Sequence, residues 1–238
     1  MIEIRPLASS SEGNAYLVTE TDGRSPLLLD CGLPVAQLKQ ATGYRLSTLA
    51  GCLVSHEHGD HSKAAADLMR AGVDCYMSQG TADALRLSGH RLKIVRALQQ
   101  FSLGAWTVLP FDTIHDAAEP LGFLLAAGEE KVLYLTDTAY CKYRFRGLTR
   151  ILIECNHSWD ILQANVESGA VPAEMKKRII RSHMSLDTVK DFFRANDLSQ
   201  VRDIWLLHLS DGNSDAERFK REIQALTGKP VYVAAERR

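Results

Sequence analysis

The chain has little cysteine and little proline, five and seven of its 238 residues respectively. The cysteines are odd in number, scattered along the sequence and never arranged as a C-x-x-C pair, which excludes a disulfide framework and a thiolate zinc site. The low proline content, together with 45% hydrophobic residues, excludes a collagen-like or disordered chain. We therefore expect free, buried thiols in an ordinary globular protein. They are Cys31, Cys52, Cys75, Cys141 and Cys155.

The sequence also lacks a long apolar run and an excess of charge of one sign. No stretch of about 18 apolar residues occurs, and the opening segment MIEIRPLASSSEGN has no apolar run suited to a signal peptide. We expect a cytoplasmic protein with no membrane segment. Lys and Arg number 28 against 29 Asp and Glu, a net charge of −1. This balance argues against a protein that coats nucleic acid indiscriminately, but it leaves room for a local basic surface.

The order of the apolar segments predicts an α/β protein with two sheets. At about 100–200 residues per domain, the length allows one large domain or two small ones, and no repeat or linker divides the chain. A β-rich start, a mixed middle and a second β-rich block followed by helices suit two stacked sheets with helices outside. We expect strands at 2–7, 15–20, 26–30, 51–55, 73–78, 106–115, 121–128, 131–137, 151–155, 204–210 and 230–234, and helices at 34–50, 61–72, 81–89, 158–195 and 215–228.

Three of the eight histidines fall within the six residues His-Glu-His-Gly-Asp-His at 56–61, directly after the apolar strand GCLVS. Imidazole nitrogens and carboxylate oxygens are ligands for zinc, manganese and iron. His56 and His58 point the same way in an extended segment, whereas Asp60 and His61 lie beyond the bend at Gly59. One loop can therefore serve two neighbouring ions.

The pattern H-x-H-x-D-H after an apolar strand resembles the signature of the metallo-β-lactamase superfamily of hydrolases. Eight segments follow the order of its YycJ/WalJ-like subgroup, and PhnP phosphodiesterase and ribonuclease Z are similar at a greater distance. The resemblance implies a four-layer αββα sandwich that forms a single domain over residues 1–238. The segments are SSSEGNAYLV, LLLDCG, VSHEHGDH, IHDAAEPLGF, LYLTDTAY, ECNHS, RSHMS and LLHLSDGN.

The resemblance implies a site for two divalent metal ions, Zn²⁺ first and Mn²⁺ or Fe as alternatives. The expected ligands outside the histidine motif each follow an apolar strand, where their side chains can converge. The alternative for a lone histidine after a strand is a surface or core residue whose hydrogen bonds are satisfied. The alternative for Asp137 is a residue that caps a turn. One ion would be held by His56, His58 and His115, the second by Asp60, His61 and His208, and Asp137 would bridge both.

Such a site implies hydrolysis by a metal-activated water. Two ions about 3.5–4 Å apart supply hydroxide at neutral pH and clamp the attacking and leaving oxygens. A diiron oxygen-chemistry site of this superfamily would carry Glu in place of His58, so the histidine favours hydrolysis. Asp60 and His183 are the expected catalytic residues. His183 matches the additional histidine of PhnP-like relatives and is expected to act as a general acid or as a donor to a phosphate oxygen, the alternative being a structural histidine.

Other polar residues are expected to support the site or the fold. Glu154 and Asn156 lie at a strand end and are expected to orient ligand imidazoles, and Asp30 is expected to be a supporting carboxylate beneath the histidine loop. Ser185 either binds a phosphate oxygen or caps the helix that begins at Leu186, and we favour the cap. A structural role is favoured for His157. The remaining histidine, His90, is expected to be exposed.

The segment 142–181 has eight basic and four acidic residues, a local charge of +4, with aromatic residues interleaved. Such a segment can guide a polyanion by phosphate contacts and base stacking, although a solvated helix face with core aromatics is the alternative reading. The basic residues are Lys142, Arg144, Arg146, Arg150, Lys176, Lys177, Arg178 and Arg181, and the aromatic ones are Tyr140, Tyr143, Phe145 and Trp159.

We therefore expect a metal-dependent phosphodiesterase that acts as a DNA or RNA nuclease, with nucleic acid as its partner. No large inserted domain is present to clamp RNA over the site, which narrows the expectation to short or end-accessible strands. Three alternatives stay open: a hydrolase of thioesters, lactones or β-lactams, a phosphodiesterase for small cyclic substrates, and a metal-binding regulatory protein without turnover. The intact ligand set argues against the last of these.

Overall fold

The fold is described from a computed structural model that covers residues 2–20 and 25–234. Its contacts divide the chain into two compact units. Of the described residues, unit 1 comprises 2–20, 25–112 and 117–130, and unit 2 comprises 113–116 and 131–234. Each unit is described by itself, and the expectation of a single domain over the whole chain stays a prediction.

Unit 1 is built around a six-stranded sheet in the order β1-β2-β3-β4-β5-β6. The first three strands form the expected antiparallel meander, and β3 to β6 run parallel to one another. Because parallel strands end at the same edge of a sheet, the loops after β3 and β4 emerge side by side. The strands are β1 (Ile2–Ser10), β2 (Gly13–Glu20), β3 (Leu27–Leu29), β4 (Gly51–Leu53), β5 (Cys75–Met77) and β6 (Leu92–Ile94).

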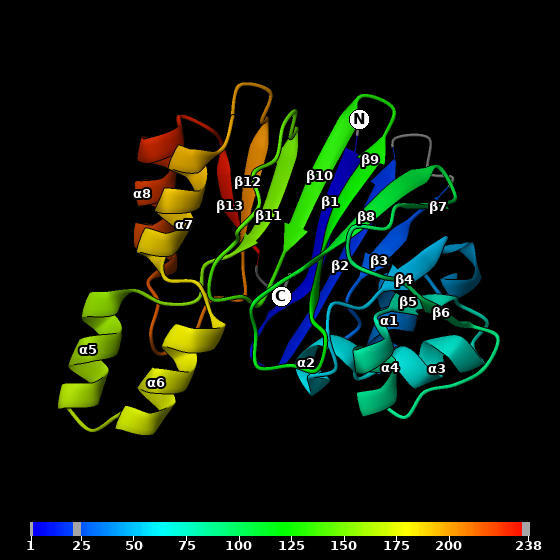
Figure 1. The fold of residues 1–238 in the computed structure, drawn as a ribbon, viewed down its shortest axis with the longest axis horizontal. Coiled ribbons are helices and arrows are strands. Elements are labelled where there is room, and N and C mark those ends of the chain that lie inside the picture. The colour runs from blue at the N-terminus through cyan, green and yellow to red at the C-terminus, as the bar shows by residue number, and fades with distance from the viewer. Residues whose placement is uncertain (1, 21–24, 235–238) are drawn as a thin grey trace. The chain divides into compact units, whose positions relative to one another are not determined.

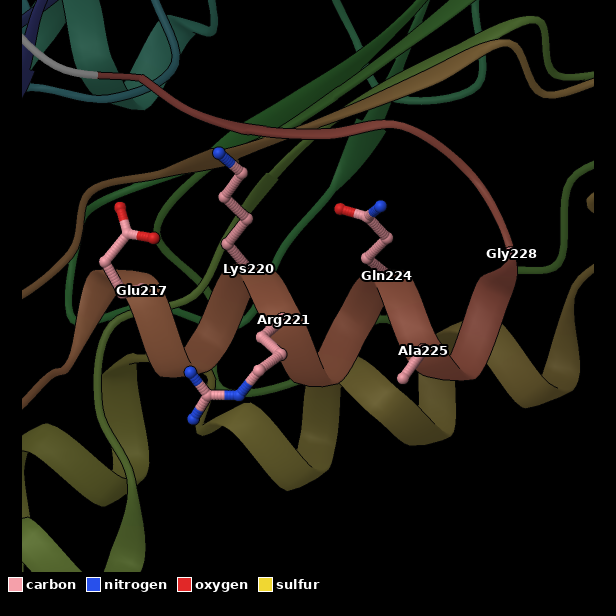
Figure 2. A pocket seen from close by; sticks show the side chains of 6 residues that line it. All are labelled: Glu217, Lys220, Arg221, Gln224, Ala225 and Gly228. Carbon is pink, nitrogen blue, oxygen red and sulfur yellow. The ribbon is translucent and has the colours of Figure 1, made fainter.

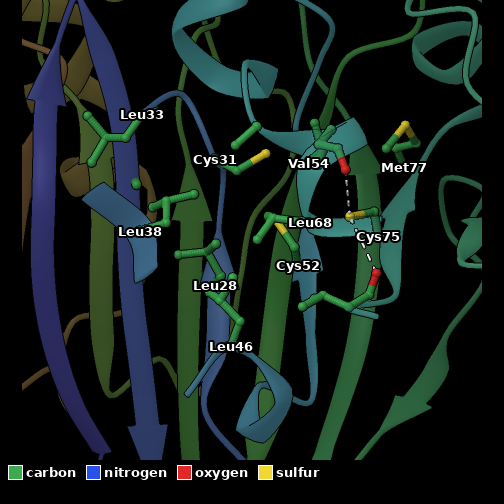
Figure 3. Close-up of a cluster of buried hydrophobic side chains, with 14 of the residues drawn as sticks. Leu28, Cys31, Leu33, Leu38, Leu46, Cys52, Val54, Leu68, Cys75 and Met77 are labelled. Atoms are coloured by element: carbon green, nitrogen blue, oxygen red, sulfur yellow. Dashed lines mark hydrogen bonds between the residues drawn. The ribbon is translucent and has the colours of Figure 1, made fainter. Parts of the chain in front are cut away.

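Short helices connect these parallel strands, as a right-handed βαβ arrangement requires. Between β3 and β4 lie α1 (Val35–Ala41) and a 3₁₀ turn (Leu46–Thr48). Between β4 and β5 lie α2 (Gly59–Ser62) and α3 (Ala65–Arg70), and α4 (Gln79–Ala84) precedes β6. The core beneath them is aliphatic and thiol-rich, with Leu28, Cys52 and Cys75 on neighbouring strands in one cluster with Leu38 of α1 and Leu68 of α3 (Figure 3). None of the five cysteines forms a disulfide, as expected; four are buried, whereas Cys141 is half-buried, contrary to the expectation.

Unit 1 also contains an antiparallel ladder of β7 (Phe101–Leu103), β8 (Trp106–Asp112) and β9 (Leu121–Ala127). Buried and half-buried residues alternate along much of β8, which is typical of a strand with one face in the core. The chain leaves β8 at Asp112 and enters the short unit 2 segment that contains His115.

Unit 2 is a parallel sheet of β10 (Glu130–Leu135), β11 (Arg150–Glu154), β12 (Asp203–Leu207) and β13 (Val231–Val233). Its helices are α5 (Trp159–Glu167), α6 (Ala173–Ser182), α7 (Leu186–Ala195) and α8 (Ala216–Thr227), and α8 packs against both α7 and β13 (Figure 1). The ends of β10, β11 and β12 carry Asp137, Glu154 and His208 at one edge of the sheet. In residues 2–20 and 25–234, no helix combines the length and the apolar character needed to cross a membrane.

Most expected elements are present, but three of the expected helices are shortened or divided. The helix expected at 34–50 ends at Ala41, and the one expected at 158–195 is three helices. Proline at position 172 precedes α6 because it has no N–H to donate to a continuing helix, and Ser185 caps α7. The segment at 61–72 is likewise divided between α2 and α3. Two strands, β6 and β7, were not expected, because a polar residue interrupts each short apolar segment, Lys93 in LKI and Ser102 in FSL.

Candidate metal centre and active site

The histidine loop of unit 1 follows β4 and turns into α2. His56 and His61 are buried, at 1% and 0% exposure, and Nε2 of His56 lies 3.1 Å from Nδ1 of His58. Beyond the bend, Oδ2 of Asp60 lies 3.3 Å from Nε2 of His61. The loop therefore brings together, within unit 1, the two expected pairs of ligand side chains.

Asp30 lies beneath this loop, in the supporting position that the sequence led us to expect. Its Oδ2 accepts a hydrogen bond of 2.6 Å from Nδ1 of His61, and its Oδ1 accepts one of 2.7 Å from the backbone N–H of Ser55. The Ser55 hydroxyl also donates to Oδ2 of Asp30, at 2.9 Å, and lies 3.0 Å from Nδ1 of His56. Because Nδ1 of His61 is engaged, its Nε2 carries the lone pair that a metal ion requires.

In unit 2 the carboxylate of Asp137 lies between two of the expected histidine ligands. Its Oδ2 is 3.6 Å from Nε2 of His115, and its Oδ1 is 3.7 Å from Nδ1 of His208. Nδ1 of His115 donates to the carbonyl oxygen of Ser182 at 2.8 Å, which leaves Nε2 as the acceptor. Burial lowers the pKa of His115, although Asp137 opposes this, so the ring favours the neutral form that binds metals.

Two further residues of unit 2 complete this group, Glu154 and His183. Metal-binding atoms of Asp137, Glu154, His183 and His208 lie within 4.8 Å of one another. Nδ1 of His183 is 2.5 Å from Oε1 of Glu154, while Oε2 of Glu154 accepts hydrogen bonds from the backbone N–H groups of Met184, at 3.0 Å, and of the residue after Asp137, at 3.2 Å. The carboxylate is therefore held by three donors from two different loops.

The charges of this pair reinforce each other. Burial opposes the charged form of Glu154, but His183 overcomes this and lowers the pKa of that carboxyl below its usual value. Burial likewise opposes the charged form of His183, but the Glu154 carboxylate outweighs it and raises the pKa of the imidazole. Both pKa shifts favour a carboxylate–imidazolium pair.

The other expected residues divide between support and structure. Asn156 donates to the backbone carbonyl of His208 at 3.1 Å and so holds the backbone of this expected ligand. The backbone of His208 is in the left-handed region, with a φ of +50°. Ser185 accepts from the N–H of Thr188 as a helix cap, and His90 is exposed. His157 is fully buried with no hydrogen-bond partner for either ring nitrogen, and burial lowers its pKa to about 4. These positions agree with the roles that were favoured for these residues from the sequence.

No sequence pattern indicated a role for four residues that contact the rings of expected ligands. Asn14 contacts His61, Ser55 contacts His56, and Ser182 and Asp116 contact His115. Asn14 lies inside one of the matching segments, but its residue type alone indicated no role. Ser182 contributes only a backbone oxygen, which no sequence pattern reveals.

The expectation of a basic binding surface over residues 142–181 is corrected in part. Arg150 lies in β11, where it forms an ion pair with Asp203, and Phe145 is buried, so neither belongs to a binding surface. The loop after β10 does expose three basic side chains, and α6 exposes three more. Tyr140 and Trp159 are 51% and 43% exposed. The exposed basic residues are Lys142, Arg144, Arg146, Lys177, Arg178 and Arg181.

A separate surface groove of about 550 Å³ runs along α8 (Figure 2). It is lined by Glu217, Lys220, Arg221, Gln224, Ala225 and Gly228. None of the expected ligands or catalytic residues lines it, and its mixed charges offer no constellation for catalysis. The groove is therefore separate from the group of polar residues at the strand ends of unit 2.

Comparison with known proteins shows the family. A model described as a β-lactamase superfamily domain matches residues 26–208. The chain is 30% identical to exodeoxyribonuclease YycJ of Bacillus anthracis, over 97% of this chain and 90% of that protein. It is 28% identical to exodeoxyribonuclease WalJ of Streptococcus pneumoniae D39, over 89% of this chain and 82% of that protein.

Solved structures share the fold at low sequence identity. The metallo-β-lactamase fold protein YhfI of Bacillus subtilis has a TM-score of 0.75 and 17% identity, covering 99% of this chain and 97% of that one. A diphosphatase of the PhnP family has a TM-score of 0.67 and 15% identity, covering 99% and 96%. The expected α/β metallo-β-lactamase fold is thus confirmed, and the chain belongs to the β-lactamase superfamily, in the subgroup that includes YycJ and WalJ.

Proposed function

We propose that this protein is a metal-dependent phosphodiesterase that degrades DNA from its ends. The observation that carries the proposal is the Glu154–His183 pair beside an expected metal ligand: Nδ1 of His183, which is bonded to Glu154, also lies 3.8 Å from Oδ2 of Asp137. Glu154 raises the pKa of His183 and so favours the protonated imidazole. A proton donor beside a metal site is what the departure of an alkoxide requires. The YycJ and WalJ relatives, both named exodeoxyribonucleases, support the choice of DNA.

The expected ligands fit divalent metal ions by their chemistry. Nδ1 of His61 is hydrogen-bonded to Asp30 and Nδ1 of His115 to Ser182, so in each ring Nε2 is left to bind a metal ion. Neutral imidazoles and carboxylates are the ligands of zinc and manganese hydrolases. The proposal includes both ligand sets and the metal, Zn²⁺ or Mn²⁺. One set is His56, His58 and His115, the second is Asp60, His61 and His208, and Asp137 bridges the two. When bound, two such ions lower the pKa of a water and stabilise charge on phosphoryl oxygens.

The protein's own residues then divide the remaining work. His183 donates the proton from Nε2 to the 3′ or 5′ oxygen that leaves the phosphorus. Glu154 fixes the ring orientation through Nδ1 and stabilises its positive charge. Both side chains are largely buried, at 16% and 0% exposure, so the pair is shielded from bulk water and its mutual attraction is strengthened.

A nucleic acid strand is guided, in this proposal, by the exposed loop that follows Asp137. Tyr140 offers a face for base stacking, and Lys142, Arg144 and Arg146 offer phosphate contacts. A single strand or a frayed end suits such a loop. A cytoplasmic location, where DNA and reduced thiols coexist, fits both the substrate and the five free cysteines.

The test is a substrate panel with metal-reconstituted protein. We expect Zn²⁺- or Mn²⁺-loaded protein to degrade end-labelled linear DNA while leaving closed circular DNA intact, and to hydrolyse bis-p-nitrophenyl phosphate. RNA and a thioester complete the panel, and Asp137→Asn serves as the inactive control of equal size. Hydrolysis of the thioester alone, or equal DNA cleavage by the Asp137→Asn variant, would contradict the proposal.

A further inference from the structure

A buried asparagine in β2 reaches the expected metal ligands of unit 1. Asn14 is 0% exposed, and its Nδ2 lies 3.1 Å from Nε2 of His61 and 3.3 Å from Oδ2 of Asp60. The same amide nitrogen donates to the carbonyl oxygen of Ser10 at 2.9 Å. Neither the fold nor the expected ligand set assigns Asn14 a role.

The neighbours of Asn14 allow only one orientation of its amide. Oδ1 accepts a hydrogen bond of 3.1 Å from the hydroxyl of Tyr16, which in turn lies 2.7 Å from the Ser9 hydroxyl. The atoms around Nδ2 include the Ser10 carbonyl and two oxygens of Asp60, all of which accept hydrogen bonds. Reversing the amide would bring an oxygen against these acceptors, so the NH₂ group must face them.

The hydrogen-bond partners of His61 likewise indicate which nitrogen of the neutral ring carries the proton. Nδ1 of His61 donates to Asp30, so Nε2 is an acceptor and faces the Asn14 amide. One N–H of Asn14 is occupied by Ser10, and the second is shared between Nε2 of His61 and Oδ2 of Asp60. When a metal ion takes the lone pair of Nε2, this N–H still has the Asp60 oxygen as its acceptor.

We propose that Asn14 is a positioning residue of the metal centre, which holds the Asp60 carboxylate and the His61 ring in place before the ion binds and retains Asp60 afterwards. The inference rests on the proposed function in one respect, that Asp60 and His61 bind a metal ion. Supporting partners of this kind typically change metal affinity about 10–100-fold when they are removed. Tyr16 and Ser9 continue the chain of contacts that fixes the amide.

The experiment measures metal binding and needs no substrate. Zn²⁺ affinity is determined by competition with a chromophoric chelator, and the visible spectrum of the Co²⁺-loaded protein reports ligand geometry. We expect Asn14→Leu to lower the affinity for one of the two Zn²⁺ ions by about 10–100-fold and to alter the Co²⁺ spectrum. Tyr16→Phe, which keeps the ring and removes only the hydroxyl that bonds Oδ1 of Asn14 and Ser9, is expected to have a smaller effect in the same direction.

Asn196→Leu is the matched control. The Asn196 side chain donates to the Phe192 carbonyl at 2.8 Å and accepts from the Phe145 N–H at 2.7 Å, so its loss costs comparable hydrogen bonds without touching a ligand. If Asn14→Leu and Tyr16→Phe lower only the melting temperature, as Asn196→Leu does, and bind both ions like the wild type, the inference is overturned. It is also overturned if the wild type binds no ion. If the wild type binds both metal ions but does not cleave DNA, only the proposed function is contradicted.

Discussion

At the scale of single residues, the buried histidines differ in what their partners allow. His183 faces a carboxylate that favours its charged form, His61 and His115 each donate from Nδ1 and have Nε2 as the acceptor, and neither ring nitrogen of His157 has a hydrogen-bond partner. The residue type is the same in each case, so the neighbouring acceptor decides whether a ring donates a proton, binds a metal ion or only fills space.

His183 is expected to matter only where a leaving group needs a proton. His183→Ala should lower kcat for DNA by about 10²–10⁴-fold. Hydrolysis of bis-p-nitrophenyl phosphate should fall far less, because p-nitrophenolate leaves without protonation. Steady-state kinetics on both substrates, with His90→Ala as the exposed control, checks this. Equal losses on the two substrates would show that His183 acts in metal or phosphate binding instead.

His157 should make the stability of the protein depend on pH. Its pKa of about 4 in the folded protein lies below its ordinary value of 6.5, so the unfolded chain binds the proton more readily. The stabilisation is fully present above about pH 6.5 and is lost as the pH falls toward 4, by about 3 kcal/mol in all. Urea unfolding of wild type and His157→Leu between pH 7 and pH 4.5 measures the difference. We expect the variant to lose less stability on acidification, and parallel curves would contradict this.

At the scale of elements, the loops of unit 1 meet because β3 and β4 are parallel neighbours. Asp30 and Gly32 follow β3, and the histidine loop follows β4, so Asp30 reaches His61 over 31 positions of sequence. Gly32 is packed so tightly against this loop that a Cβ there would lie 1.7 Å from the backbone oxygen of Asp60. The close approach is possible only because glycine has no side chain.

Gly32→Ala should therefore displace α2 and the ligands it carries. Overpacking of this kind costs about 1–3 kcal/mol, and we expect both a lower melting temperature and weaker Zn²⁺ binding. Gly212→Ala is the control, since nothing lies within 4 Å of the Cβ it would add. Thermal unfolding and chelator competition on the two variants test the prediction, and a Gly32→Ala protein with wild-type metal affinity would refute it.

At the scale of the whole molecule, the near-zero net charge conceals an uneven distribution. The loop after β10 and helix α6 expose basic side chains in a chain whose total charge is −1. Some of these charges are already neutralised, since Arg178 pairs with Asp116 at 2.6 Å. The loop residues Lys142, Arg144 and Arg146 are exposed and lie in the loop that follows Asp137, so we take them as the candidates for contact with a polyanion.

Replacing Lys142, Arg144 and Arg146 together by Gln should weaken the binding of single-stranded DNA and flatten its salt dependence. Each phosphate contact contributes about 0.7 to the slope of log K against log salt, so three contacts give a change of about 2. Hydrolysis of bis-p-nitrophenyl phosphate should be unchanged. The control neutralises Lys220, Arg221 and Lys229 on and beside α8, and an equal loss of DNA affinity there would mean that only total charge matters.

Local sequence patterns, above all the histidine motif after an apolar strand, were enough to predict the family, the fold class, the strand ends and the residue types of the candidate site. It also placed Asp30 beneath that motif. The interruption of the long helices was less visible, although Pro172 and Ser185 carry the signal for it.

Only the tertiary structure decided how those residues are held. The contacts of His61 with Asn14, of His183 with Glu154 and of His115 with the Ser182 carbonyl join positions 47, 29 and 67 residues apart. Tertiary packing likewise moved Arg150 from the expected basic surface into an ion pair in β11. Hydrogen-bond partners depend on which loops meet at a sheet edge, and that is a property of the packed chain, not of any local pattern.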